Sequence, residues 1–347
     1  MKKIACFTVI FALAVTAVFS GGGREKKKAS GGGPTGRITI YTSMYRDIVD
    51  AVSMALLTRF PDCQIEFQYG GTGTIQAKIA SEQATGKIGC DILMVAEPAY
   101  SLELKENGIL HPYLSGEAGN IAFDYDRDGY WYPVRVSNMV LAYNPDKTPK
   151  NTVPNSFYDF ANDAGMRGAV SMSNPLSSGT ALATVTALRD KYGYDYFDAL
   201  GKQGVVIESS AVAVAKLEKG EHKVIMILEE SILKKREEEK SRLEVIYPAD
   251  GTVMIPSTIM IVNDQWNANG NIKAAEAITD WFLSAEGQNT IVDAWMHSVR
   301  SGFPRLPYDS IPTDRIQANS LPVNWENCYR DREEIRTKFE EFVTNRK

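Results

Sequence analysis

The chain has 347 residues, of which 44% are hydrophobic and 23% are charged, and its formal net charge is -5. This ordinary globular composition excludes collagen-like, low-complexity and wholly disordered chains. Lysine and arginine are scattered along the sequence, so no basic patch indicates nucleic-acid binding. At roughly 150 residues per domain, the length predicts two domains with cores of their own.

Residues 1–20 have the layout of a secretory signal peptide. Two lysines precede an apolar run from Ile4 to Phe19, and small residues follow this run. The run is shorter than the roughly 20 apolar residues that a membrane span needs. We therefore expect export to the periplasm. A lipid anchor stays open, although Gly21 stands where a bacterial lipoprotein would carry its acylated cysteine.

Residues 21–36 are rich in glycine and lysine and predict a flexible tether. Beyond it, the exported chain keeps three cysteines, Cys63, Cys90 and Cys328. An odd number leaves at least one thiol unpaired in an exported protein. We expect buried free thiols, because two of these cysteines begin predicted strands and no CxxC pair suggests metal or redox chemistry. The pairing itself stays open.

From residue 37 onward, short apolar runs alternate with segments of helical period. The first unit predicts strand 37–42, helix 45–60, strand 63–69, helix 75–84, strand 91–95 and helix 98–106. This order of elements indicates a mostly parallel sheet that helices cover on both faces.

A second unit of the same kind follows and ends in additional helices. It predicts strands 135–144 and 169–173, helix 180–192, strand 205–207, helix 209–218, strand 223–228, helix 230–240, strands 243–247 and 252–262, helices 272–284 and 286–296, a proline-rich stretch 303–322, and helix 325–344. We therefore place the chain in the α/β class.

An ordered set of sequence stretches gives the chain a family resemblance. In order they are ITIYTSMY, FQYGGTGTIQAKI, GCDILMVAEPAYSLELKENGIL, VRVSNMVLAYNP, SNPLSSGTAL and FLSAEGQNTIVDAW. Over residues 37–343 the chain resembles the ferric-iron-binding-protein family, which are periplasmic solute-binding proteins of ATP-binding-cassette (ABC) importers. The resemblance implies a two-lobe periplasmic-binding-protein architecture, in which each lobe is a mostly parallel sheet flanked by helices and two crossing hinge strands join the lobes.

The resemblance also implies where the lobes begin and end. Residues 37–134 together with 257–300 would form the first lobe, and residues 135–256 the second. Residues 301–347 would be a C-terminal extension and helix. The hinge crossings would lie near residues 132–138 and 254–259, and the ligand would lie in the cleft between the lobes.

Polar residues and glycines gather where the predicted strands end, which is where open α/β sheets bind ligands. The turns Gly71–Thr74 and Ser177–Thr180 also begin helices, whose free N–H groups and dipole attract anions. Helix capping alone would explain the Ser and Thr residues of either turn. Two such turns in one cleft favour an anion pocket instead, and Arg135 could bind the same anion through two hydrogen bonds. We predict as ligand-binding residues Tyr41, Thr42, Ser43, Gly71, Thr72, Gly73, Thr74, Arg135, Ser177, Ser178, Gly179, Thr180 and Ser210.

Ferric iron is a hard cation that prefers oxygen ligands. The family's iron binders supply two adjacent tyrosines after the strand that matches residues 223–228, whereas Glu229 and Glu230 stand there in this chain. We predict Tyr45, Glu97, Glu229 and Glu230 as metal ligands, and which of the two neighbouring glutamates faces the cleft stays open. These carboxylates would serve an ammonium or sugar hydroxyls equally well.

Two ligands therefore remain as hypotheses. The resemblance favours ferric iron as cargo, with or without a bridging anion, and implies no resident cofactor. We place iron first, because it is the family's commonest assignment. The hydroxyl-rich helix starts favour a small phosphorylated organic molecule, such as a sugar phosphate or an aminophosphonate.

A secreted enzyme is the alternative from another class. The sequence has neither a GxSxG elbow nor an HExxH motif, and the Ser177–Ser178 pair has no histidine near it in sequence. We therefore predict no catalytic residues. We expect a monomer that captures its ligand by lobe closure and delivers it to the membrane permease of an ABC importer.

Overall fold

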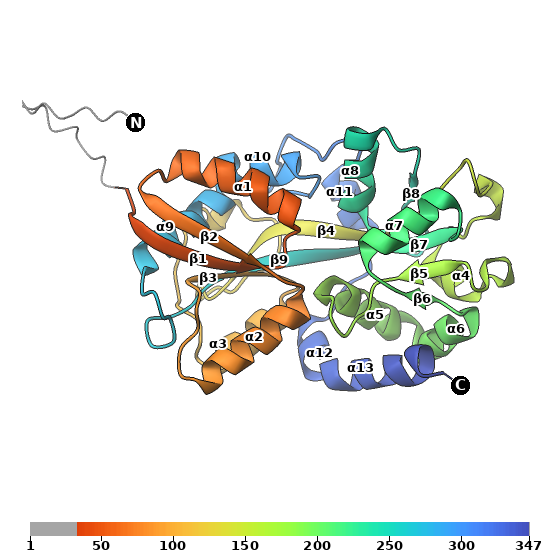
Figure 1. The fold of residues 1–347 in the computed structure, drawn as a ribbon, viewed down its shortest axis with the longest axis horizontal. Coiled ribbons are helices and arrows are strands. Elements are labelled where there is room, and N and C mark those ends of the chain that lie inside the picture. Colours follow the sequence, from red (N-terminus) through yellow and green to blue (C-terminus); the bar gives the residue numbers. More distant parts are fainter. Residues whose placement is uncertain (1–32, 347) are drawn as a thin grey trace, which may run out of the picture. The chain divides into compact units, whose positions relative to one another are not determined.

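A computed structural model describes residues 33–346 of the chain (Figure 1). The predicted signal peptide and residues 21–32 of the predicted tether lie outside the described residues. Within residues 33–346, no helix is both long enough and apolar enough to cross a membrane.

The strands of the described residues form one continuous mixed sheet. Its order is β2-β1-β3-β9-β4-β7-β5-β6, and β8 pairs with β4 beside this path. The strands are β1 Gly36–Thr42, β2 Cys63–Tyr69, β3 Ile92–Ala96, β4 Tyr132–Tyr143, β5 Val170–Met172, β6 Val206–Ile207, β7 Val224–Leu228, β8 Glu244–Ile246 and β9 Val253–Ile261.

Helices cover both faces of the sheet (Figure 1). They are α1 Arg46–Arg59, α2 Thr72–Ala84, α3 Ala99–Glu106, α4 Phe157–Asn162, α5 Gly179–Tyr192, α6 Asp195–Gln203, α7 Ser210–Lys219, α8 Glu229–Glu239, α9 Ile272–Leu283, α10 Ala285–Asp293, α11 Thr313–Ala318, α12 Trp325–Arg330 and α13 Arg332–Phe339. A short π-helical turn, Glu340–Thr344, follows α13.

Two strands connect the two halves of the sheet. The parallel strands β2, β1 and β3 form one half, and the parallel strands β7, β5 and β6 belong to the other. Between them, β4 and β9 pair antiparallel from Tyr132 opposite Ile259 to Met139 opposite Val253. Both predicted hinge crossings lie in this paired stretch. The two-lobe α/β architecture is therefore confirmed, while the exact lobe boundaries stay predictions.

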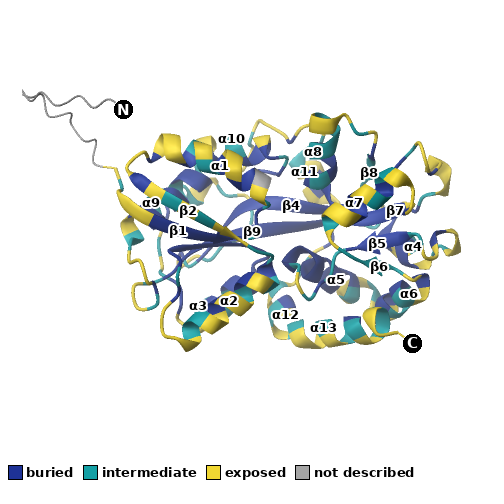
Figure 2. Ribbon diagram, viewed as in Figure 1, coloured by how far each residue is buried: buried dark blue, intermediate teal, exposed yellow. Residues whose placement is uncertain are grey.

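The hinge strands are buried along their whole length. Every residue of β4 and of β9 is buried (Figure 2). They lack the alternating exposure of a strand with one solvent face, because helices cover both faces, and they bury polar residues such as Arg135, Ser137 and Ser257. The apolar cores of both lobes therefore extend to the hinge strands, with Val134 and Val136 in one core and Met139 and Leu141 in the other.

The expected buried free thiols are confirmed. Cys63, Cys90 and Cys328 are all unpaired and buried, and burial raises the pKa of each thiol. At neutral pH they are therefore neutral apolar side chains rather than reactive thiolates.

The C-terminal region differs from the prediction. The single helix predicted over 325–344 is divided, because Asp331 separates α12 from α13 and forms an ion pair with Arg189 of α5, 2.9 Å away. The proline-rich stretch contains a short helix, α11, which begins directly after Pro312. A proline is tolerated there because the first N–H groups of a helix have no partner within the helix.

Candidate functional site

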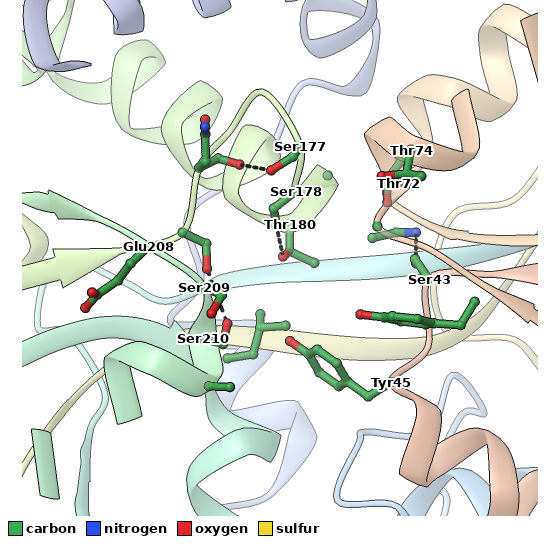
Figure 3. Close-up of a pocket in the computed structure, with 18 of the residues that line it drawn as sticks. Ser43, Tyr45, Thr72, Thr74, Ser177, Ser178, Thr180, Glu208, Ser209 and Ser210 are labelled. Carbon is green, nitrogen blue, oxygen red and sulfur yellow. Dashed lines mark hydrogen bonds between the residues drawn. The ribbon is translucent and has the colours of Figure 1, made fainter. Parts of the chain in front are cut away.

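A cleft of about 610 Å³ lies at the carboxyl ends of strands from both lobes (Figure 3). Ser43 follows β1, Ala96 ends β3, Ser173 follows β5 and Leu228 ends β7. This is the position where open α/β sheets bind ligands. The cleft is lined by Ser43, Tyr45, Tyr69, Gly71, Thr72, Thr74, Ala96, Arg135, Ser173, Asn174, Ser177, Ser178, Gly179, Thr180, Ile207, Glu208, Ser209, Ser210, Ala211 and Leu228.

Three helices begin at the cleft. Gly71, Ser178 and Ser209 are the N-cap residues of α2, α5 and α7, and all three line the cleft. The Ser178 hydroxyl accepts a hydrogen bond from the Ala181 N–H at 3.2 Å, and the Ser209 hydroxyl accepts one from Val212 at 3.4 Å. These serines therefore cap their own helices and also border the cleft. The positive ends of three helix dipoles consequently meet there.

Arg135 supplies a positive charge at the cleft. It lies on hinge strand β4 and is only 5% exposed. Its Nη1 donates to the Ser137 hydroxyl at 3.2 Å, and that hydroxyl donates to Glu230 Oε1 at 2.8 Å. Burial lowers the pKa of Arg135, while the nearby charge of Glu230 raises it. Because an arginine remains protonated in proteins, the guanidinium stays a cation, and Ser137 and Glu230 hold its position.

The carboxylate of Glu208 already has three partners within the protein. It accepts hydrogen bonds from Ser171 at 2.9 Å and Lys216 at 2.5 Å, and His222 Nε2 lies 2.5 Å away. Burial raises the pKa of Glu208, but these three partners outweigh it and the pKa lies below its ordinary value. Figure 3 shows the side chain pointing away from the other labelled residues. The described cleft lining therefore offers mainly hydrogen-bond donors and hydroxyls.

Tyr45 faces the cleft as a neutral phenol. Burial, followed by the charge of Glu230, raises the pKa of Tyr45 to about 12. In Figure 3 its hydroxyl points toward Ser210 across the cleft. A tyrosine protonated at neutral pH is a hydrogen-bond donor rather than an anionic ligand.

Most of the predicted ligand-binding residues are brought together. Tyr41, Thr42 and Gly73 are the exceptions, since none of them lines the cleft. The Tyr41 hydroxyl donates to Glu82 at 2.9 Å, and the Thr42 hydroxyl accepts from the Met44 N–H at 3.1 Å. The predicted residues that line the cleft are Ser43, Gly71, Thr72, Thr74, Arg135, Ser177, Ser178, Gly179, Thr180 and Ser210.

The four predicted metal ligands do not meet. Tyr45 lines the cleft, whereas Glu97, Glu229 and Glu230 do not. Within residues 33–346, no group of three His, Cys, Asp or Glu side chains is placed to hold a metal ion. Glu230 is buried beside Ser137 and lines an adjoining hollow of about 410 Å³.

Glu229 is saturated by protein groups behind the hinge. Its Oε1 accepts hydrogen bonds from Tyr247 and Ser310, both at 2.5 Å. Its Oε2 accepts from Asn138 at 3.0 Å and lies 3.0 Å from His297 Nε2. Burial raises the pKa of Glu229, yet these partners keep it below its ordinary value. The carboxylate is therefore ionised and committed to a structural network, with no free lone pair directed at the cleft.

The sequence analysis missed several cleft residues. Ser173 and Asn174 stand next to the predicted turn at Ser177, in the same SNPLSSGT stretch. Ser209 begins α7 in the same way that Ser178 begins α5, so the pattern of serine at a helix start would have identified it. Glu208 and Tyr69 carry no such signal, because only the tertiary structure brings them to the cleft.

The two lobes, the hinge strands and the cleft define a two-lobe binding protein. The chain belongs to the family of bacterial extracellular solute-binding proteins, whose model matches residues 90–329. A probable ABC transporter periplasmic-binding protein of Sinorhizobium fredii, y4fP, is 20% identical over 279 residues, which cover 76% of this chain and 75% of that protein. The protein is therefore a solute-binding protein of an ABC importer and not an enzyme.

Solved structures of two binding proteins share the fold. The periplasmic binding protein AfuA from Actinobacillus pleuropneumoniae, with exogenous fructose-6-phosphate bound, has a TM-score of 0.78 at 19% identity. That match covers 89% of this chain and 99% of AfuA. Iron-bound HitA from Pseudomonas aeruginosa has a TM-score of 0.75 at 19% identity, over 88% of this chain and 99% of HitA. At these identities the similarity shows the fold alone.

Proposed function

We propose that this protein captures a small phosphorylated organic molecule in the cleft and delivers it to the permease of an ABC importer. The observation that carries the proposal is the convergence of three helix N-termini and buried Arg135 on one cleft. Helix N-termini and arginine both favour a phosphate group. The Ser and Thr hydroxyls around them suit the hydroxyls of a sugar.

The volume and charge of the cleft support the same ligand class. A cleft of about 610 Å³ is in the range of pockets that hold small organic molecules. Among the described residues that line it, the charged side chains are Arg135 and Glu208, and Glu208 is ion-paired with Lys216 and lies within hydrogen-bond distance of His222. Arg135 is linked through Ser137 to Glu230 outside the cleft lining, and no described carboxylate in the lining is left free to repel an anionic ligand.

Ferric iron is the second candidate, and two observations favour it. The family resemblance leads to it, and HitA, whose fold is similar, is iron-bound. Tyr45 would be a ligand in the cleft. The metal would have to displace a proton from Tyr45, whose pKa is about 12, and Glu97, Glu229 and Glu230 would not assist it. We therefore rank ferric iron below the phosphorylated organic molecule as the candidate ligand.

The same proposal includes export of the protein and the compartment in which it works. We propose that residues 1–20 direct export and that the protein works in the periplasm as a monomer. Lobe closure around the ligand would then present the bound form to the permease.

Thermal unfolding of the purified, metal-stripped protein tests the ligand class. The additions are fructose 6-phosphate, glucose 6-phosphate, 2-aminoethylphosphonate, unphosphorylated fructose and ferric citrate. A ligand at about 100 times its dissociation constant stabilises the folded state by about 2.7 kcal/mol. We expect a rise in the unfolding temperature with a phosphorylated compound and none with fructose. A rise with ferric citrate alone, with a visible tyrosinate absorption, would transfer the assignment to iron.

Arg135→Gln shows whether the cleft is the site of binding. Hydrogen bonds to charged groups contribute about 1.5–3 kcal/mol each, so we expect affinity for the stabilising compound to fall at least tenfold by calorimetry. Arg315→Gln is the matched control, because Arg315 is exposed and does not line the cleft. Equal affinity in both variants, with both folded, would show that the ligand binds elsewhere.

A further inference from the structure

The two lobes touch each other directly at a pair of glycine-containing turns. The turn that begins α2 in the first lobe meets the turn that begins α5 in the second. The Gly73 N–H donates a hydrogen bond to the Ser177 carbonyl at 3.2 Å. This bond joins the backbones of two lobes, so it can exist only when the lobes are together.

The contact leaves too little room for a Cβ atom at Gly73 or at Gly179. A Cβ atom on Gly73 would lie 2.9 Å from the Leu176 carbonyl oxygen and 3.1 Å from Ser177 Cα. A Cβ atom on Gly179 would lie 2.9 Å from Thr72 Oγ1 and 3.1 Å from the Ala96 carbonyl oxygen. Backbone atoms oppose both positions, so a rotamer change alone cannot relieve these contacts.

Backbone conformation does not explain these glycines. Neither Gly73 nor Gly179 has a positive φ, so an alanine could adopt either conformation without strain. Both positions also lie within the first turns of helices, where alanine is a better helix former than glycine. What requires a glycine at each position is the opposite lobe.

We propose that Gly73 and Gly179 form a closure seam, which sets how closely the lobes approach and thereby how tightly the protein holds its ligand. Gly73 does not line the cleft, whereas Gly179 lines it beside Thr72. Neither glycine has a side chain to offer a ligand, so both act by positioning the lobes. The inference rests on the proposed capture by lobe closure but not on the identity of the ligand.

Thr72 gives the seam a second role. Its hydroxyl is buried and has no hydrogen-bond partner, and Thr72 lines the cleft. The hydroxyl oxygen lies 2.9 Å from the position that a Cβ atom on Gly179 would take. Closure therefore brings an unsatisfied donor to the edge of the cleft. Burying such a group without a partner is costly, so a ligand oxygen that accepts from Thr72 favours the closed arrangement.

Chemical cross-linking across the lobes measures closure without any ligand. Gln76 of α2 and Arg336 of α13 are in contact, with 3.4 Å between the Gln76 Oε1 and Arg336 Nη2 atoms. Both are replaced by cysteine, and the rate of cross-linking by a short bismaleimide is recorded. The three natural thiols are buried and react slowly. The initial rate is proportional to the population in which the lobes are together.

Gly73→Ala and Gly179→Ala are each added to this double-cysteine protein. We expect each to lower the cross-linking rate about tenfold relative to the parent protein. Gly70→Ala is the matched control in the same turn, because its Cβ atom would make only ordinary contacts, 3.5 Å from Ile75 and Thr74. Its rate should equal that of the parent.

Hydrogen exchange at residue 73 provides the second measurement. The amide at this position has its acceptor in the other lobe, so its exchange should become faster in Gly179→Ala than in Gly70→Ala. Unchanged cross-linking and exchange in folded Gly73→Ala and Gly179→Ala proteins would overturn the proposal. Failure of the proposed phosphorylated ligand would leave these rates as they are, so the two proposals fail separately.

Discussion

Glu97 directly follows β3 in a left-handed conformation, with φ of 70°, and is completely buried. Its Oε2 accepts a hydrogen bond from the Tyr100 N–H at 3.3 Å, while Oε1 has no partner. Burial raises the pKa of Glu97 to about 8, against the opposing charges of Arg332 and Arg336. Backbone strain and an unsatisfied carboxyl oxygen at one position indicate that this residue is retained at a cost to stability.

The sign of the pH dependence follows from this raised pKa. In the unfolded chain the carboxyl group ionises near pH 4.3, whereas in the folded protein it stays protonated to about pH 8. The unfolded state therefore releases its proton first as the pH rises, and folding loses stability between these values. Below pH 4.3 the penalty is absent, and above pH 8 it is fully present.

We predict that Glu97→Gln stabilises the protein at alkaline pH. Each unit of pKa shift corresponds to about 1.4 kcal/mol, so the gain should reach a few kcal/mol at pH 8.5 and nearly vanish at pH 4.5. Urea unfolding at both pH values measures it. The control is Asp124→Asn, at an exposed position. A variant less stable than the natural protein at pH 8.5 would contradict the prediction.

At the scale of elements, the C-terminal helices hold the two lobes together. Ile335 and Phe339 belong to the apolar core of the second lobe. From the same segment, Arg332 forms an ion pair with Glu103 of α3 at 2.6 Å. The Tyr329 hydroxyl donates a hydrogen bond to Glu106, also of α3. We call α12 and α13 the C-terminal clasp, because they pack on one lobe and bond to the other.

We predict that Arg332→Ala loosens the clasp without unfolding either lobe. The side chain is 15% exposed and its partner Glu103 is 25% exposed, so the pair contributes more than a surface ion pair, which is typically about 0.2–1 kcal/mol. Small-angle scattering of the ligand-free protein should show a larger radius of gyration. Arg330→Ala is the matched control, since Arg330 pairs with Glu326 inside α12. Equal radii for the two variants would refute the clasp.

The elements themselves were largely predictable. The predicted strand 63–69 coincides with β2, and helix 180–192 differs from α5 by one residue, because both carry a clear local pattern. Helices α4 and α6 were missed, because their short apolar patterns are compatible with loops and are fixed by packing in the second lobe. The break at Asp331 was missed because its partner Arg189 is distant in sequence.

The candidate site was predictable where its signal is local. Gly71 and Ser178 were found because residues at helix starts follow rules of sequence alone. The sequence could not show that the Glu229 carboxylate is hydrogen-bonded by the protein itself. Its partners Tyr247, His297 and Ser310 come from separate segments of the chain. Two adjacent glutamates look available in a sequence, and only the fold shows that one of them is saturated.

At the scale of the whole molecule, we predict that the hinge pair is the most stable part of the structure. β4 is hydrogen-bonded to β7 on one side and to β9 and then β8 on the other, and it is buried throughout. Backbone amides in such strands exchange only on global unfolding. Hydrogen-exchange mass spectrometry should therefore show the slowest exchange in β4 and β9, and fast exchange at the closure seam. Faster exchange in β4 than in α5 would show that the lobes are not joined rigidly there.

The place of β9 in the sheet also governs the order in which the chain can be completed. Strand β3 has β9 as its neighbour, with Ala96 opposite Ser257, so the first half of the sheet keeps an open edge until the chain has been made past residue 261. Contacts between residues so distant in sequence form slowly. For the exported chain that we propose, the N-terminal half of the sheet therefore cannot be completed until most of the chain has been synthesised. The second crossing strand thus completes the first half of the sheet as well as joining it to the second half.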